Sequence, residues 1–217
     1  MAIFNTVYGG EPKWKPWSNT LAYYPLETDT NDYSGNSNNL TNNWIIFSTY
    51  DNVKCWYFNK SAYAQKSWSL FTWNPTFTVS EWIKTNGSSN WQNTWFIGET
   101  WSNNSFSIWL YWNTRQVYVW GWSNDKATWK YIADSIWHNI TFTYSGGSGI
   151  VYIDGVSVYT WTWSPNIISW YTMLWNNNDL WVDYLYWYLS QVIIEDKVRT
   201  ADEVVKYYNS TKSTYGL

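Results

Sequence analysis

A polar loop between residues 27 and 41 carries the side chains best suited to bind a metal ion. Its sequence, ETDTNDYSGNSNNLT, is rich in carboxylates and amides and too polar to be buried. Calcium takes six to eight oxygen ligands from carboxylates, amides and backbone carbonyls, and this loop offers all three. The candidate metal ligands are Asp29, Asn31, Asp32 and Asn36. The alternative is a loop of Asx turns, in which these side chains bond their own backbone.

Aromatic residues at alternating positions indicate a second kind of binding surface. Trp and Tyr rings present broad faces with a polar edge, which suits stacking against a sugar ring. Such rings recur at same-face spacing on two predicted strands, 105–111 and 116–120, and just beyond them. The candidate carbohydrate-binding residues are Trp109, Tyr111, Tyr118, Trp120 and Trp122. Two alternatives stay open: the rings fill the core, or the tryptophans stand where glycine is expected.

The strands that would position these residues are best defined between Ile136 and Tyr159. Three alternating runs are separated there by Gly146-Gly147-Ser148-Gly149 and by Asp154-Gly155. A two-residue Asp-Gly between alternating apolar residues predicts a β-hairpin, because a type I′ turn needs positive φ at both central positions. The stretch is therefore predicted to be a β-meander.

Further strands follow with turn signals every 8–12 residues or so, the spacing of an all-β sandwich. The clearest runs from Phe77 to Lys84, with Phe77, Val79, Glu81 and Ile83 on one face. One short helix is predicted from Ala201 to Asn209, where Thr200 and Glu203 form a capping box. We predict an N-terminal arm over residues 1–18, able to mediate oligomerisation, and one all-β domain over 19–217.

Composition excludes several classes of function. The net charge is -3 and the Lys and Arg residues are scattered, so nucleic acid is not an expected partner. The single cysteine, Cys55, excludes an internal disulfide and is expected to be a small buried hydrophobe. The N-terminus lacks the pattern of a signal peptide, and no apolar run suggests membrane insertion.

Four stretches, in this order, resemble the concanavalin A-like lectin/glucanase superfamily, and specifically its laminin-G-like and pentraxin-like jelly-roll domains. The stretches are LAYYPLETDTNDYSGNSNN, FTVSEWIKT, IWHNITFTYSGGSGIVYIDGVSV and LSQVIIEDKVRTADEVVKYYN. The resemblance implies a two-sheet antiparallel jelly roll with a ligand or calcium site on the loops at one rim. Where the family often has an acidic pair before the last apolar strand, this chain has Ser190-Gln191. Gln191 is therefore a further candidate calcium ligand, together with the loop around Asp179 or Asp183.

The resemblance also implies a function. We expect a non-catalytic module that binds a glycan or cell-surface polysaccharide, or an adhesive module, in a bacterial or phage surface or virion protein, with calcium as the candidate cofactor. The alternatives are a purely structural spacer or assembly module and a glycoside hydrolase of the same superfamily. The expected location is extracellular, on a cell surface or in a virion.

The carboxylates do not favour the hydrolase. Glucanases of the superfamily carry paired carboxylates on one face of a strand as acid and nucleophile. Glu27, Asp29 and Asp32 imitate that spacing, but they lie in a polar loop. Glu195-Asp196 is adjacent, so on a strand the two side chains would point to opposite faces. The only histidine, His138, is expected to be structural, so the chain is not predicted to be an enzyme.

Tryptophan is unusually abundant, with 22 residues against 11 glycines. Many lie at predicted turns or strand ends, where glycine is typical because it accepts positive φ. We hypothesise that these codons are UGA, read as glycine in the source genome and translated here as tryptophan. The positions are Trp17, Trp44, Trp56, Trp101, Trp112, Trp161, Trp163, Trp175, Trp181 and Trp187.

Overall fold

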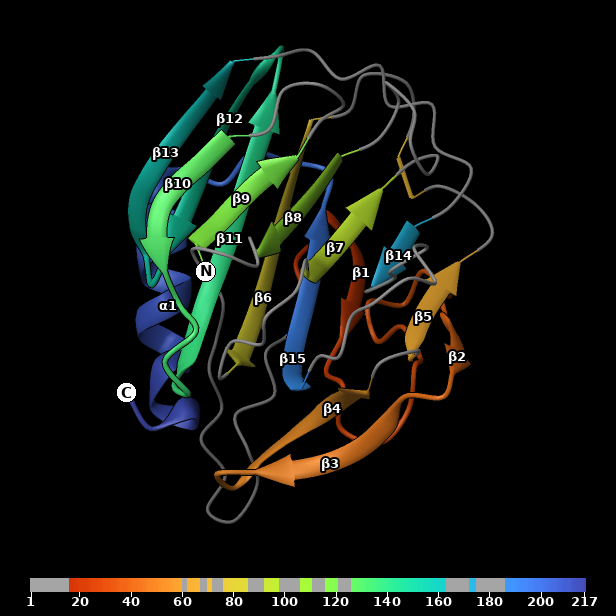
Figure 1. Ribbon diagram of the computed structural model, residues 1–217. Helices are drawn as coiled ribbons and strands as arrows, with labels where there is room; N and C mark the ends of the chain where they lie inside the picture. The colour runs from red at the N-terminus through yellow and green to blue at the C-terminus, as the bar shows by residue number, and fades with distance from the viewer. Residues whose placement is uncertain are drawn as a thin grey trace.

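The computed structural model describes residues 16–59, 62–66, 70–71, 76–85, 92–97, 106–110, 116–120, 126–162, 172–174 and 186–217. Within these residues two antiparallel sheets pack face to face, and one helix lies outside them (Figure 1). The predicted all-β, two-sheet antiparallel sandwich with one short C-terminal helix is confirmed.

The first sheet has eight strands in the order β13-β12-β11-β6-β15-β4-β3. The remaining strand, β1, pairs with the second half of β15, beyond the part that pairs with β4. The strands are β1 (Thr20–Tyr24), β3 (Ile46–Tyr50), β4 (Val53–Asn59), β6 (Phe77–Thr85), β11 (Trp137–Ser145), β12 (Ser148–Ile153), β13 (Val156–Thr162) and β15 (Tyr186–Glu195).

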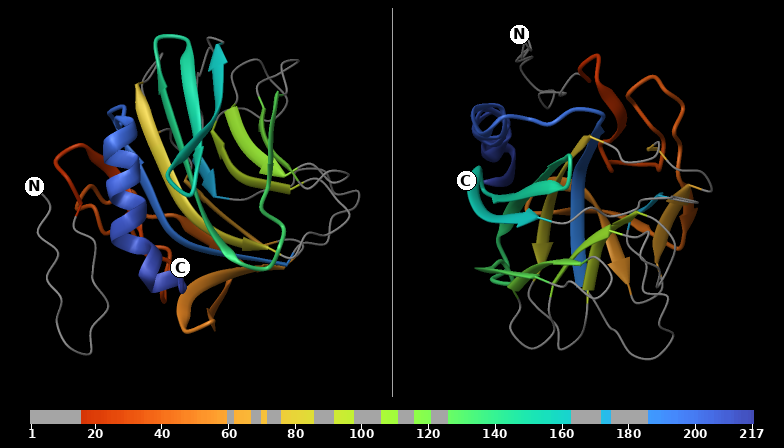
Figure 2. Two further views of the ribbon diagram at one scale, coloured as in Figure 1. Left: turned by 90° about the vertical axis from the view of Figure 1, so that its left-hand side faces the viewer. Right: turned by 90° about the horizontal axis from the view of Figure 1, so that it is seen from above.

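The second sheet has seven strands in the order β10-β9-β8-β7-β14-β5-β2. Two views at right angles show it as a separate layer, on the side of the first sheet away from the helix (Figure 2). Its strands are β2 (Thr41–Asn43), β5 (Tyr63–Lys66), β7 (Gln92–Ile97), β8 (Phe106–Leu110), β9 (Gln116–Trp120), β10 (Lys126–Tyr131) and β14 (Thr172–Leu174).

Strand β6 lies at the centre of the first sheet and is buried along its whole length. Phe77, Val79 and Ile83 join the core between the sheets, as the alternating pattern predicts. The opposite face is also buried because it packs against the C-terminal segment, where Trp82 is fully buried. Because both faces of β6 are covered, its more polar outer face is buried as well.

The meander from β11 to β13 has the predicted hairpin geometry. Asp154 and Gly155 adopt φ values of 54° and 78°, the positive angles of a type I′ turn. The preceding turn also contains two positive-φ glycines, Gly146 at 56° and Gly147 at 86°. These local turn residues fix the register of three neighbouring strands.

The C-terminal segment covers the outer face of the first sheet (Figure 2). Helix α1 (Ala201–Thr211) begins with the predicted capping box of Thr200 and Glu203, and the 3-10 helix η1 (Lys212–Tyr215) continues it. The ring of Tyr215 stacks on Trp82 with centroids 3.9 Å apart. Aromatic stacking on β6 thus holds the end of the chain against the sheet.

Cys55 is fully buried, and burial raises the pKa of its thiol to about 12, which fits its predicted role as a small hydrophobe. Among the described residues, no helix is long and apolar enough to cross a membrane. Residues 1–15 of the predicted N-terminal arm lie outside the described part of the chain, so the arm, its boundary and its proposed role in oligomerisation stay predictions. Trp17, near the end of that arm, packs beside Tyr23, Ile193 and Tyr207.

Candidate functional site

The polar loop between β1 and β2 is organised around the carboxylate of Asp32. Its Oδ1 accepts hydrogen bonds from the backbone N–H groups of Tyr23 at 2.9 Å and Ser34 at 2.8 Å. Its Oδ2 accepts from the Ser34 hydroxyl at 2.8 Å and the Asn38 N–H at 2.9 Å. Four donors on one carboxylate fix the loop against β1, which is the bonding expected of an Asx turn.

Asparagine side chains attach the same loop to the backbone of β1. The Asn36 amide donates to the carbonyl of Thr20 at 2.7 Å, and the Asn38 amide donates to that of Leu21 at 2.7 Å. Among the described strands, β1 pairs with β15 alone, so these side chains bond carbonyl groups on its other edge. Part-buried backbone oxygens need such a partner. The abundance of Asn and Asp in this loop therefore serves its own folding.

The outward side of the loop presents a separate group, the Tyr33 surface, formed by Asp29, Asn31 and Tyr33. The Asp29 carboxylate accepts from the Tyr33 hydroxyl at 3.0 Å and from the Asn31 amide at 2.9 Å. The Tyr33 side chain is 51% exposed. The hydrogen bond to Asp29 raises the pKa of Tyr33, because the bond needs the protonated hydroxyl. The result is an open aromatic ring beside a fixed carboxylate and amide.

The predicted calcium ligands are only partly gathered by this geometry. A calcium ion bound to Asp32 would have to displace donors that the carboxylate already holds. Gln191 lies in a β15 bulge with φ 47°, and its backbone N–H donates to the carbonyl of Pro25 at 3.4 Å, just before the loop. Within the described ranges, no group of three His, Cys, Asp or Glu side chains could hold a metal ion. Asp179 and Asp183 lie outside those ranges, and calcium binding stays a prediction.

The predicted aromatic platform lies on strands that are indeed neighbours. Trp109 of β8 is the register partner of Tyr118 of β9. Ile108 and Val119 point into the core, so the half-buried Tyr118 belongs to the opposite face of the sheet. Tyr111 and Trp122 lie outside the described residues, as do the side chains of Trp109 and Trp120. The platform as a whole stays a prediction.

Paired catalytic carboxylates are not seen in the described part of the chain. Glu27 lies 3.6 Å from Lys54, and Asp32 is held by backbone donors. One carboxylate, Glu81 of β6, is buried on the face that points between the sheets. No other Asp or Glu is buried on that face among the described residues. Glu81 alone could not supply both the acid and the nucleophile of a glycosidase.

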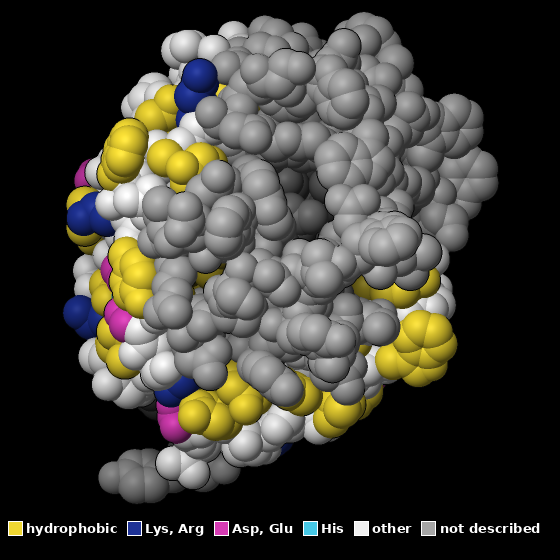
Figure 3. All heavy atoms as spheres, viewed as in Figure 1, with side chains coloured by type: hydrophobic (Ala, Val, Ile, Leu, Met, Phe, Trp, Pro, Cys, Tyr) yellow, Lys and Arg dark blue, Asp and Glu magenta, His cyan; other side chains and the backbone are white. Residues whose placement is uncertain are grey.

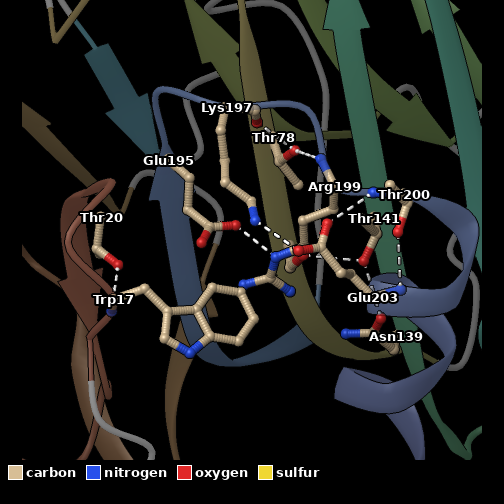
Figure 4. A network of polar contacts seen from close by, with 11 residues as sticks. Trp17, Thr20, Thr78, Asn139, Thr141, Glu195, Lys197, Arg199, Thr200 and Glu203 are labelled. Carbon is tan, nitrogen blue, oxygen red and sulfur yellow. Dashed lines mark hydrogen bonds and ion pairs between the residues drawn. The ribbon is translucent and has the colours of Figure 1, made fainter. Parts of the chain in front are cut away.

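A buried ion pair lies on the outer face of the first sheet (Figure 4). Arg199 and Glu195 form this pair, and both side chains are fully buried. The guanidinium carbon lies 4.4 Å from the ring centre of Trp17 and 4.7 Å from that of Tyr207. Burial raises the pKa of Glu195, although the charge of Arg199 opposes the shift. The pair joins the N-terminal segment to the helix, and its only sequence signal is opposite charge at i,i+4.

His138 links the meander to the loop before it. Its Nδ1 lies 2.7 Å from Asp154 Oδ2, and its Nε2 lies 3.2 Å from Asp134 Oδ1. Burial lowers the pKa of His138, but the hydrogen bonds and charges of the two carboxylates outweigh it and raise the pKa overall. The carboxylates bind opposite sides of the ring, so they cannot converge on one metal ion. This histidine joins two loops through hydrogen bonds to their carboxylates, which agrees with its predicted structural role.

Comparison with known families identifies the class of protein to which the chain belongs. The model of a laminin-G-like family of the concanavalin A-like lectin/glucanase superfamily matches residues 58–205. The chain belongs to this superfamily, and the resemblance predicted from four stretches of sequence is confirmed. No curated protein sequence matches the chain.

Solved structures share the jelly-roll fold at low sequence identity. Domain 4 of AbnA, a GH43 extracellular arabinanase from Geobacillus stearothermophilus in complex with arabinotriose, has a TM-score of 0.71 at 20% identity, covering 87% of this chain and 97% of that one. The binding domain of Paraclostridial Mosquitocidal Protein 1 has a TM-score of 0.69 at 20% identity, covering 88% and 52%. The binding domain of botulinum neurotoxin DC in complex with SialylT has a TM-score of 0.68 at 13% identity, covering 89% and 52%. This chain therefore spans about half the length of those toxin binding domains.

Proposed function

We propose that this domain is a non-catalytic carbohydrate-binding module of a bacterial or phage surface or virion protein. The observation that carries the proposal is the Tyr33 surface, where a ring that is 51% exposed lies beside the carboxylate of Asp29 and the amide of Asn31. A sugar ring can stack on the aromatic face while its hydroxyls bond the neighbouring polar groups. Ligand-binding sites commonly combine such an aromatic contact with a few polar groups that orient the ligand.

The known relatives support a binding role. One structural neighbour is an arabinanase domain in complex with arabinotriose, and another is a toxin binding domain in complex with SialylT. Those ligands belong to those proteins, and for this chain they define the compounds to test first. Among the described residues Glu81 is the one carboxylate buried between the sheets, whereas glycosidases generally need two, and this favours binding without hydrolysis.

The charge of the loop bears on the kind of glycan. The charges of Asp29 and, more weakly, Glu27 act on Tyr33, and Lys54 lies 3.6 Å from Glu27 only, which leaves Asp29 as the charge beside the ring. Like charges repel when a ligand carboxylate approaches them, so the Tyr33 surface suits neutral sugars better than sialylated or uronic ones. We therefore propose neutral oligosaccharides as the ligand class.

The test is a glycan array followed by titration of the best ligand against single variants. Tyr33→Ala is expected to reduce affinity at least tenfold, whereas Tyr50→Ala, which removes an exposed tyrosine at the tip of the β3–β4 hairpin, is expected to leave it unchanged. Tyr118→Ala tests the predicted platform on β9 in parallel. Loss of affinity only in Tyr118→Ala would move the site to the platform and overturn the Tyr33 assignment. A lack of binding to every glycan would favour the purely structural alternative.

A further inference from the structure

Two tryptophans adopt a backbone conformation that suits glycine. Trp44 has φ 61° and Trp129 has φ 60°, both in the left-handed region. There the Cβ of an L-residue crowds the following carbonyl oxygen, and only glycine enters without this penalty. Asn and Asp tolerate the region when their side chains bond locally, but a bulky residue in it is an outlier.

The local structure at position 129 is a bulge that specifies a left-handed residue. Between Ala127 and Tyr131 strand β10 shifts its register against β9. The Thr128 hydroxyl turns inward and donates to the carbonyl of Val117 at 2.8 Å. Trp129 then takes the left-handed conformation, and the strand pairs with β9 again at Tyr131. A common β-bulge places glycine at this left-handed position.

The local structure at position 44 is a tight link between β2 and β3. The Asn42 side chain accepts a hydrogen bond from the Ile45 N–H at 2.9 Å, which spans Trp44 and holds the turn. Two residues, Trp44 and Ile45, join the two strands, and Trp44 takes the positive φ. The sequence pattern predicts glycine at position 44 but not at position 129.

Burial does not offset the backbone strain at either residue. Trp44 is 74% exposed and Trp129 is 77% exposed, the highest values among the large hydrophobic residues that the structure describes. Figure 3 shows hydrophobic side chains on the surface at its lower right edge, where β2 and β3 lie. A large apolar side chain left in water contributes little of the stabilisation that burial brings.

Other tryptophans of the chain behave differently, which limits the inference to these two. Trp56 and Trp161 are buried in the core between the sheets, and Trp82 and Trp137 are buried in the cluster beneath the C-terminal segment. Trp82 stacks on Tyr215, so its ring is part of the fold. Of the ten positions suspected from sequence, Trp56 and Trp161 thus have a packing role, and Trp17 covers Arg199. The side chain of Trp187 and the other suspected positions, apart from Trp44, lie outside what the structure describes.

We infer that positions 44 and 129 are glycine positions of this fold, and that tryptophan stands there because a glycine codon of the source genome has been read as tryptophan. The codon that fits is UGA, which some genetic codes assign to glycine and others to tryptophan. The ratio of 22 tryptophans to 11 glycines is the composition that such a reading produces. The inference stands independently of the proposed glycan site.

The protein test compares Gly and Ala at each position in the full chain. Trp44→Gly and Trp129→Gly are each expected to raise the melting temperature by about 2–4 °C. Trp44→Ala and Trp129→Ala remove the same indole but keep the Cβ, so their gain should be clearly smaller. Trp82→Gly is the opposite control, and it should lower the melting temperature.

The gene gives an independent readout. UGA at codons 44 and 129, with UGG at codon 82, is the expected pattern. The inference is overturned if the glycine variants are no more stable than the alanine variants. It is equally overturned if both codons are UGG.

Discussion

The ring of Tyr215 lies parallel to that of Trp82, with an interplanar angle of 11° and centroids 3.9 Å apart. The Tyr215 hydroxyl also bonds the Ser190 hydroxyl at 3.1 Å. The last turn of the chain is thus joined to β6 and β15, the two central strands of the first sheet. These contacts explain why a strand with serine and threonine on its outer face is nevertheless buried.

Removal of this contact should cost much of the stability of the domain. Tyr215→Ala is expected to lower the free energy of unfolding by about 3–5 kcal/mol, because a large aromatic ring leaves a buried site. Tyr215→Phe keeps the stack and loses one hydrogen bond, so a loss of about 1 kcal/mol is expected. Urea denaturation of the two variants measures the difference, and equal losses would show that the ring stack contributes little.

The Arg199–Glu195 pair should show strong coupling. Arg199→Met leaves the Glu195 carboxylate buried without its partner, and such a change typically costs about 3–5 kcal/mol. Adding Glu195→Leu removes the stranded charge, so the double variant should be more stable than Arg199→Met alone. A double-mutant cycle by chemical denaturation measures the coupling. Additive losses would mean that the two charges do not interact.

Stability should depend on the protonation of His138. The carboxylates of Asp154 and Asp134 raise its pKa above the ordinary value, so the folded state binds this proton more tightly than the unfolded state. Its contribution is complete below the unfolded pKa of about 6.5 and is lost as pH rises through the higher folded pKa. Because the chain has one histidine, a single imidazole resonance in an NMR titration reports this pKa directly.

Two variants check the assignment of that titration. Asp154→Asn removes a charged partner of the ring, so it should lower the pKa of His138. His138→Gln should remove the corresponding step from the profile of stability against pH. A profile that keeps the step in His138→Gln would assign it to another group.

Calcium binding is tested by melting the protein with and without the ion. A ligand that binds only the folded state stabilises it, by about 1.4 kcal/mol when its concentration is ten times the Kd. We expect millimolar calcium to raise the melting temperature of the parent chain and to have less effect on Asp29→Asn. Asp202→Asn, an exposed carboxylate on α1, is the matched control. Equal shifts in all three proteins would exclude the loop as the site.

Local sequence signals predicted the parts of the fold that local interactions determine. The Asp154-Gly155 turn, the alternation of β6 and the capping box at Thr200 each depend on residues close in the chain. Each of the three has the predicted geometry, because turn and cap chemistry act within a few residues.

Contacts between distant segments could not be read from the sequence. Nothing near Trp17 indicates that it covers Arg199, and nothing near Trp82 indicates a partner in Tyr215. The polar loop left calcium binding and Asx turns as alternatives, because both use the same side chains. The structure assigns Asp32 to the backbone and leaves Asp29 on the surface, a distinction that depends on the path of β1 beside the loop.

The hydrogen bonds of Asp32 also bear on how fast a sugar could bind. A loop already fixed by four donors has no segment to order when a ligand arrives, so association should follow a single exponential whose rate rises linearly with ligand concentration. The entropy lost on binding would then come mainly from the sugar and the side chains of the Tyr33 surface. The Asx turns of this loop would thereby hold the exposed Tyr33 ring in place for the proposed sugar.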